Sequence, residues 1–140
     1  MLKIILCCGG GFSSSAIAAR MQKEIEQRGL QNEYSIDFYP LEVAGERYAE
    51  NKLNQYDIAI LCPHLKMVIA RILKTNAKFN MPIYLLPPKI YGNMKLDVIL
   101  ADCEDIIELY KNGAENPVHF PGEENLLRIT RGVAYRDLKK

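Results

Sequence analysis

Short apolar runs recur along the chain, and the residues between them return to apolar positions every three or four places. Residues 2–7 and 57–61 are apolar almost throughout, which predicts strands of a parallel sheet that are buried on both faces. Residues 33–39 alternate apolar and polar, as expected for a strand with an exposed side or an edge position. Residues 82–86 form the fourth apolar run, which two prolines close.

The intervening stretches have helical spacing. Residues 13–28 carry an apolar side chain at every fourth position and end at Gly29, so they predict a helix. Similar spacing predicts helices over residues 64–75 and 95–111, and a short one around residues 46–54. Because strands alternate with helices, we predict a single α/β domain with a four-stranded parallel sheet and helices on both faces.

The end of the chain differs from the rest. Residues 125–140 carry five basic residues against one acidic residue, a local excess of +4. We therefore divide the chain into a domain of residues 1–112 and a basic extension of residues 113–140, a loop that a short amphipathic helix could follow. We expect this end to be a solvated helix or frayed rather than a docking element.

Composition narrows the class of protein. The net charge of +1 gives no reason to expect a nucleic acid partner, and no apolar run approaches the ~18 residues of a membrane span. The start of the chain is too short to read as a signal peptide. The four cysteines are irregularly spaced and make a poor disulfide framework, which predicts a reducing cytoplasm. We expect Cys7 and Cys103 to fill the core.

The most informative stretch follows the first strand. Cys8 ends that strand, and the loop and helix start after it read Gly9, Gly10, Gly11, Phe12, Ser13, Ser14 and Ser15. Glycines let a backbone fold closely around a ligand, and the first amides of a helix have no partner within the helix and attract anions. We therefore predict that Cys8 is phosphorylated, and that backbone amides and serine hydroxyls of this loop hold the phosphate without a metal or organic cofactor.

Three other glycine loops fit less well. A Walker A loop needs a lysine, and no lysine lies between Lys3 and Lys23. A dinucleotide fingerprint needs a third glycine where Ser14 stands. Low-molecular-weight tyrosine phosphatases and arsenate reductases carry an arginine six residues after the cysteine, and for Cys8 that position is again Ser14. Without the arginine there is no bidentate clamp for a phosphoryl group in transfer, so phosphatase activity is disfavoured.

The loop from Leu6 to Ser15 resembles the active-site loop of the IIB components of the bacterial phosphotransferase system, lactose/cellobiose family. Matching Gly11 to Ser13 with that pattern places the phosphocysteine at Cys8. The resemblance covers about residues 2–111, with supporting motifs at residues 38–40 with 44–46, at residues 61–64 and at residues 90–92.

This resemblance implies sheet order 2-1-3-4, as in low-molecular-weight tyrosine phosphatases. It implies a cytoplasmic protein-phosphocysteine–sugar phosphotransferase component (EC 2.7.1.-). Such a component takes a phosphoryl group from a IIA histidine and passes it to a sugar bound by a membrane IIC component. The first alternative is a regulatory IIB-like module that takes no part in transport. A relative of cysteine phosphatases or arsenate reductases is a less favoured alternative.

The end of the third strand carries further candidates. Cys62 stands where the family usually has glycine, and His64 where it usually has glutamine. We expect Pro63 and His64 to lie at the same sheet edge as the loop, because ligands bind at the carboxyl ends of parallel strands. A zinc site from Cys62, His64 and His119 is disfavoured because a fourth ligand at recognisable spacing is missing.

Overall fold

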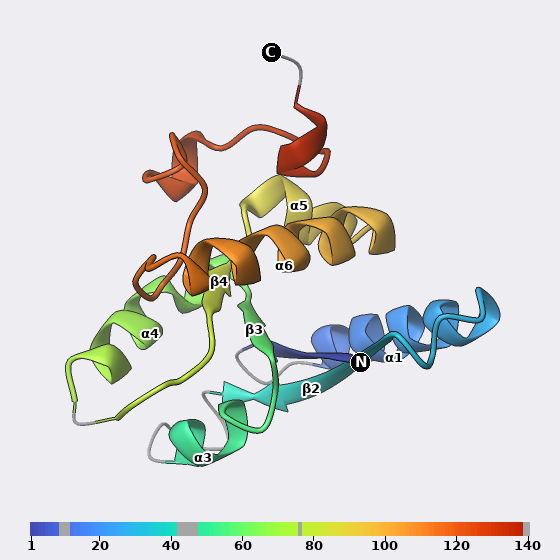
Figure 1. The fold of residues 1–140 in the computed structure, drawn as a ribbon, viewed down its shortest axis with the longest axis horizontal. Helices are drawn as coiled ribbons and strands as arrows, with labels where there is room; N and C mark the ends of the chain where they lie inside the picture. The colour runs from blue at the N-terminus through green and yellow to red at the C-terminus, as the bar shows by residue number, and fades with distance from the viewer. Residues whose placement is uncertain (9–11, 42–47, 76, 139–140) are drawn as a thin grey trace.

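Four parallel strands form one sheet in the order β2-β1-β3-β4 (Figure 1). The computed structural model describes residues 1–8, 12–41, 48–75 and 77–138, and for residues 12–14 it describes the backbone alone. The strands are β1 (Leu2–Cys8), β2 (Tyr34–Pro40), β3 (Ile58–Leu61) and β4 (Ile83–Leu85). The predicted fold class and strand order are therefore confirmed, and β2 lies at an edge as its alternating pattern predicts.

Helices cover both faces of this sheet, and α6 and α3 lie on opposite sides of the strands in Figure 1. The helices are α1 (Phe12–Gln27), α3 (Ala49–Leu53), α4 (Lys66–Leu73), α5 (Pro88–Asn93) and α6 (Leu96–Lys111), with short 3-10 turns η2 (Pro63–Leu65), η3 (Leu126–Arg128) and η4 (Tyr135–Asp137). Among the described helices, none is long and apolar enough to cross a membrane.

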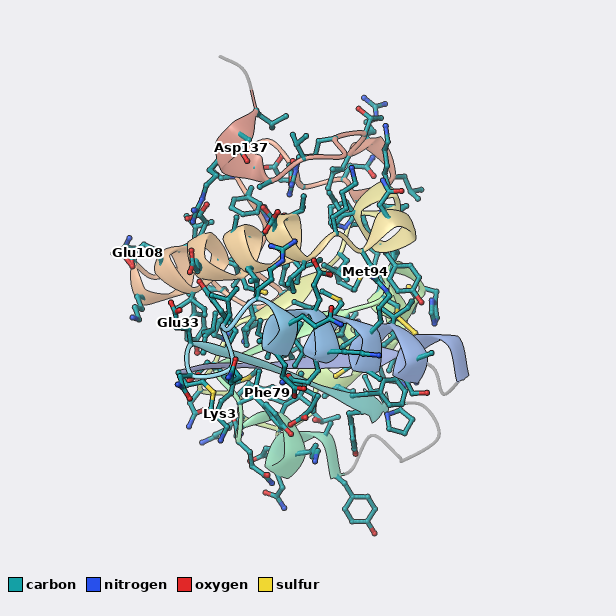
Figure 2. The ribbon with its side chains drawn as sticks, turned by 90° about the vertical axis from the view of Figure 1, so that its right-hand side faces the viewer. Lys3, Glu33, Phe79, Met94, Glu108 and Asp137 are labelled. Atoms are coloured by element: carbon teal, nitrogen blue, oxygen red, sulfur yellow. A yellow bond between two sulfur atoms is a disulfide. The ribbon has the colours of Figure 1, made fainter. Side chains whose placement is uncertain are left out.

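The central strand β1 explains how the core is divided into two layers. Ile4 and Leu6 point into a cluster with α1, α5 and α6, whereas Ile5 and Cys7 point into a second cluster with α3 and α4. Successive side chains of a strand face opposite sides of the sheet. When helices cover both sides, a continuous apolar run therefore contributes side chains to both core layers. Figure 2 shows the side chains that fill the space on each side of the strands. Cys7 is fully buried, which confirms its predicted place in the core.

The helix α5 is absent from the sequence prediction. Two prolines after β4 suggest only the end of a strand, yet Pro88 occupies the first turn of α5. Proline is tolerated there because the backbone N–H groups of the first turn have no hydrogen-bond partner within the helix. Met94 closes the helix in the left-handed conformation, with φ of 43°, and its N–H donates to the Ile90 carbonyl. Part of the predicted helix around residues 46–54 is α3, and residues 42–47 lie outside the described part of the chain.

The predicted amphipathic helix of the extension is wrong. Residues 125–138 hold the two 3-10 turns η3 and η4, and Arg131 between them is only 7% exposed, so this part is neither a solvated helix nor frayed. Val118 belongs to the same core cluster as α6, and its N–H donates to the Ile83 carbonyl at 2.8 Å. The extension thus gives a hydrogen-bond partner to edge strand β4, which edge strands otherwise lack.

Candidate functional site

The register of the sheet brings two cysteines to one edge. The parallel strands β1 and β3 are neighbours, and Cys7 pairs with Leu61 at their carboxyl ends. Cys8 follows Cys7 and Cys62 follows Leu61, and the Cys62 N–H donates to the Cys7 carbonyl at 3.1 Å. Because side chains alternate along a strand, Cys7 and Leu61 enter one apolar layer while Cys8 and Cys62 face away from it.

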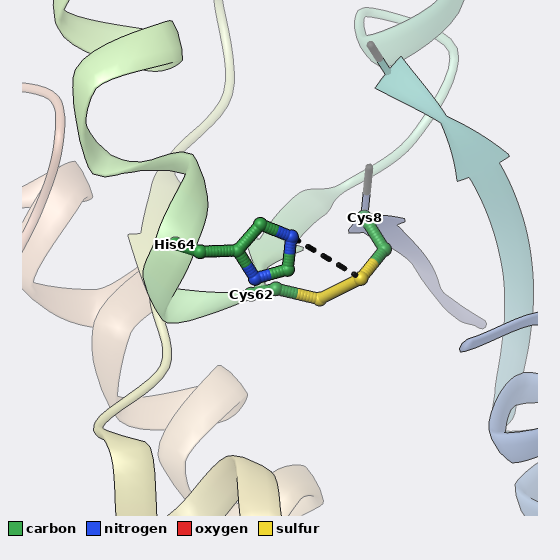
Figure 3. A group of neighbouring side chains, drawn as sticks. All are labelled: Cys8, Cys62 and His64. Carbon is green, nitrogen blue, oxygen red and sulfur yellow. Dashed lines mark hydrogen bonds between the residues drawn. A yellow bond between two sulfur atoms is a disulfide. The ribbon is translucent and has the colours of Figure 1, made fainter. Parts of the chain in front are cut away.

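Cys8 and Cys62 are joined by a disulfide, with their Cα atoms 5.4 Å apart (Figure 3). The expectation from the sequence that the four cysteines make a poor disulfide framework therefore does not hold for this pair. The two residues are separated by 54 positions, and only the pairing of β1 with β3 makes them neighbours. Cysteine spacing along the sequence carries no trace of that pairing.

Two polar side chains surround the Cys8 sulfur. The His64 Nε2 lies 4.0 Å from the Cys8 Sγ (Figure 3), and the Tyr91 hydroxyl lies 3.5 Å from it. The turn η2 holds His64 just after Cys62 with its side chain exposed, and α5 holds Tyr91 half-buried. Cys8 is 4% exposed, yet within the described chain neither apolar cluster includes Cys8 or Cys62. The sulfur therefore lies at a polar edge of the sheet and not in the apolar interior.

Tyr91 is the contact that residue-by-residue reasoning misses. The segment Ile90 to Gly92 is part of the family resemblance, but no property of the sequence connects it with Cys8. The connection depends on α5, which starts directly after β4 and points Tyr91 back over the ends of the strands. An unrecognised short helix thus hides a candidate site residue.

Cys8, Cys62 and His64 also form a group of possible metal ligands, because one ligand atom of each lies within 4.8 Å of the others. His119, part of the disfavoured zinc set, is not in this group; its Nδ1 lies 3.1 Å from the Phe120 carbonyl oxygen. Two thiolates and an imidazole suit zinc or copper(I). Sulfurs joined in a disulfide provide no thiolate, so only the reduced pair offers this donor set.

The other two cysteines have a different environment. Burial raises the pKa of the Cys7 thiol to about 12. Burial also raises the pKa of Cys103, on α6, well above its usual value, and the nearby carboxylates of Asp102 and Glu104 add to the effect. Because the thiolate is the reactive form, these two thiols are inert near neutral pH. Thiol chemistry in this chain therefore belongs to Cys8 and Cys62.

The predicted phosphate loop is only partly within the described structure. Gly9, Gly10 and Gly11 lie outside the described residues, and only the backbone of residues 12–14 is described. Ser15 lies half-buried in the first turns of α1, and Pro63 is half-buried at the start of η2, directly after Cys62. The structure thus brings Pro63 and His64 to the edge where Cys8 ends β1, while the amide cradle stays a prediction.

Comparison with known families gives a match that covers more than half of the chain. The family described as PTS system, Lactose/Cellobiose specific IIB subunit, matches residues 3–102. In the comparison with curated proteins, no sequence is similar enough to count as a match. The matched span includes all of the sheet except Leu2, and it includes Cys8, Cys62, His64 and Tyr91. The chain therefore belongs to the lactose/cellobiose-specific IIB family of the phosphotransferase system of sugar transport.

Proposed function

We propose that this chain is a phosphocarrier in which the Cys8 sulfur accepts a phosphoryl group from a histidine of a IIA protein. The chain then transfers the group to a sugar held by a membrane IIC component. The family supports a phosphotransferase role and IIA and IIC partners in general. The acceptor atom, the direction of transfer and the cytoplasmic setting are the parts that we propose.

The observation that carries the proposal is the position of Cys8. It ends the central strand at the carboxyl edge of the sheet, where ligands of open α/β sheets bind. The helix α1 begins at Phe12, four residues later, so the positive end of its dipole follows Cys8 closely along the chain. A sulfur in this place has polar neighbours, and the helix that starts soon after it in the sequence has an N-terminal end of the kind that favours a phosphate dianion.

The proposed transfer balances without a cofactor. The reduced Cys8 thiolate attacks the phosphorus of the donor phosphohistidine, an S–P bond forms, and the P–N bond breaks as the donor imidazole takes a proton. In the second step a sugar hydroxyl oxygen attacks the phosphorus, the S–P bond breaks, Cys8 leaves as the thiolate and the hydroxyl proton passes to solvent. The Tyr91 hydroxyl, 3.5 Å from the sulfur, can donate a hydrogen bond to the Cys8 thiolate that attacks in the first step and to the thiolate that leaves in the second.

Mass spectrometry of the intact protein tests this proposal. The chain is first reduced with dithiothreitol. It is then incubated with a IIA protein of a lactose/cellobiose phosphotransferase system that is phosphorylated on its histidine. We expect the wild-type chain and the control variant Cys7→Ser to gain one phosphoryl group, and Cys8→Ser to gain none. Full labelling of Cys8→Ser would refute the proposal, and loss of labelling in Cys7→Ser alone would move the acceptor to Cys7.

The same experiment separates the carrier from a regulatory module. A carrier releases its phosphoryl group to sugar when membranes that contain a IIC component are added, whereas a regulatory module keeps it. We expect the phosphoryl group on Cys8 to disappear on addition of membranes and sugar, and to persist with either one alone.

A further inference from the structure

The sheet itself holds Cys8 and Cys62 at bonding distance. Disulfides usually join cysteines whose Cα atoms are about 4.4–6.8 Å apart. The 5.4 Å separation of Cys8 and Cys62 lies within this range. The separation follows from the pairing of β1 with β3 and from the hydrogen bond between the Cys62 N–H and the Cys7 carbonyl. The two sulfurs can therefore bond or separate while the strands stay paired.

No other cysteine competes for either sulfur. Cys7 follows the alternation of β1 into the opposite apolar layer, and Cys103 is buried on α6 within the first layer. Both are free thiols. All four cysteines are buried, but Cys8 differs from Cys7 and Cys103 because the polar side chains of His64 and Tyr91 lie close to its sulfur. Oxidation of the chain is therefore directed to one pair.

We propose that Cys8 is a site of reversible oxidation and that Cys62 is its resolving cysteine. The oxidant class is a hydroperoxide. The Cys8 thiolate attacks the terminal peroxide oxygen, the O–O bond breaks, and an alcohol or water leaves, which makes a sulfenic acid at Cys8. The Cys62 thiolate then attacks the Cys8 Sγ, the S–O bond breaks, and hydroxide leaves as water after it takes a proton. Two thiols thus give two electrons and become one disulfide.

The consequence rests on the phosphocarrier function proposed above. A phosphoryl group and Cys62 need the same sulfur atom, so a Cys8 held in the disulfide has no thiolate to attack phosphorus. The oxidised chain cannot enter the transfer, and a dithiol reductant restores it by thiol–disulfide exchange. The disulfide also protects Cys8, because a sulfenic acid without a resolving thiol is oxidised further to irreversible acids.

The first arm of the test does not depend on phosphoryl transfer. The reduced chain is treated with hydrogen peroxide, denatured, alkylated with N-ethylmaleimide and mapped by peptide mass spectrometry. We expect a Cys8–Cys62 link, with Cys7 and Cys103 alkylated. The variant Cys62→Ala should form no link and should leave a Cys8 sulfenic acid that dimedone traps. The control Cys103→Ala, which also removes a fully buried cysteine, should link as the wild type does.

The second arm measures phosphoryl acceptance from a phosphorylated IIA protein before peroxide, after peroxide, and after dithiothreitol. We expect peroxide to lower wild-type acceptance on the order of tenfold or more, and dithiothreitol to restore it. In Cys62→Ala, excess peroxide should abolish acceptance beyond recovery.

The outcomes are distinct. Alkylated Cys62 in peroxide-treated wild type, or full acceptance by the linked protein, overturns the redox proposal. No acceptance by the reduced wild type, with the link still formed, overturns the phosphocarrier function alone.

Discussion

Two polar clusters lie beside the same sheet and use their polar groups in opposite ways. The tail network joins the extension to the sheet and α6, and consists of Tyr84, Asp102, Glu123 and Arg131. The sulfur site consists of Cys8, Cys62, His64 and Tyr91. The Arg131 guanidinium contacts its partners at 2.7–3.1 Å, whereas Tyr91 and His64 lie 3.5 and 4.0 Å from the Cys8 sulfur.

The tail network satisfies a buried charge completely. Arg131 donates to the carboxylates of Asp102 and Glu123, to the Tyr84 hydroxyl and to the Val133 carbonyl. Burial works against its charge, but the hydrogen bond to Glu123 and the charge of Asp102, which also accepts a hydrogen bond, raise the pKa of Arg131. The guanidinium also lies 5.2 Å from the Phe120 ring centroid. A group held this way fixes one arrangement of the extension and has no freedom left for chemistry.

The sulfur site, by contrast, surrounds a larger atom, so its contacts of 3.5 and 4.0 Å are not directly comparable with distances between nitrogen and oxygen. A sulfur that must bond to phosphorus, to another sulfur or to neither cannot be enclosed by short hydrogen bonds in any one state. The comparison teaches that the structural cluster holds a charge whose hydrogen bonds are all satisfied within the chain, and that the reactive cluster holds an atom that can exchange its bonding partner.

The largest expected effect is on the tail network. We expect Arg131→Met to lower the free energy of unfolding by about 3–5 kcal/mol, because it leaves the Asp102 carboxylate buried without its cation. Urea denaturation of the reduced protein measures this change. Phosphoryl acceptance per folded molecule should stay at the wild-type level. A loss below about 1 kcal/mol would show that the network contributes little to stability.

A smaller effect is expected at the sulfur site, and on rate instead of stability. We expect Tyr91→Phe to slow phosphoryl acceptance by the reduced chain about fivefold, because one hydrogen bond to the thiolate, of about 1 kcal/mol, is lost. Stopped-flow or quench measurements with a phosphorylated IIA protein give this rate. The matched variant Tyr110→Phe loses a hydroxyl that donates to the Phe79 carbonyl, and should react at the wild-type rate. Equal acceptance rates for the two variants would show that the Tyr91 hydroxyl does not assist phosphoryl transfer to Cys8.

The smallest effect is expected at a second arginine of the extension. Arg136 donates to the carboxylates of Asp105 and Glu104 on α6, but its side chain is 45% exposed. Ion pairs in water are screened and contribute about 0.2–1 kcal/mol. We expect Arg136→Ala to cost no more than this in urea denaturation, which makes it the exposed counterpart of Arg131→Met. If Arg136→Ala lowered the free energy of unfolding as much as Arg131→Met, burial would not explain the difference expected between these two arginines.

The parts of the site that the sequence predicts are those encoded within a few residues. Cys8 at the end of an apolar run and His64 after the next run can both be assigned to the carboxyl edge of a sheet. Tyr91 escapes prediction because two prolines conceal the start of α5. Arg131 escapes because a basic stretch reads as solvated, while its burial depends on acceptors from β4, α6 and the extension itself.

The sequence alone determines the order of the four strands and of the longer helices along the chain, the strand that is buried on both faces, and the opposite directions of Cys7 and Cys8. Periodicity encodes these features because it reports which side of an element avoids water. Only the tertiary structure decides that Cys62 faces Cys8, that Tyr91 approaches the sulfur, and that a basic tail packs against the sheet. The reason is that such contacts depend on the register between strands far apart in the chain, and no local pattern records that register.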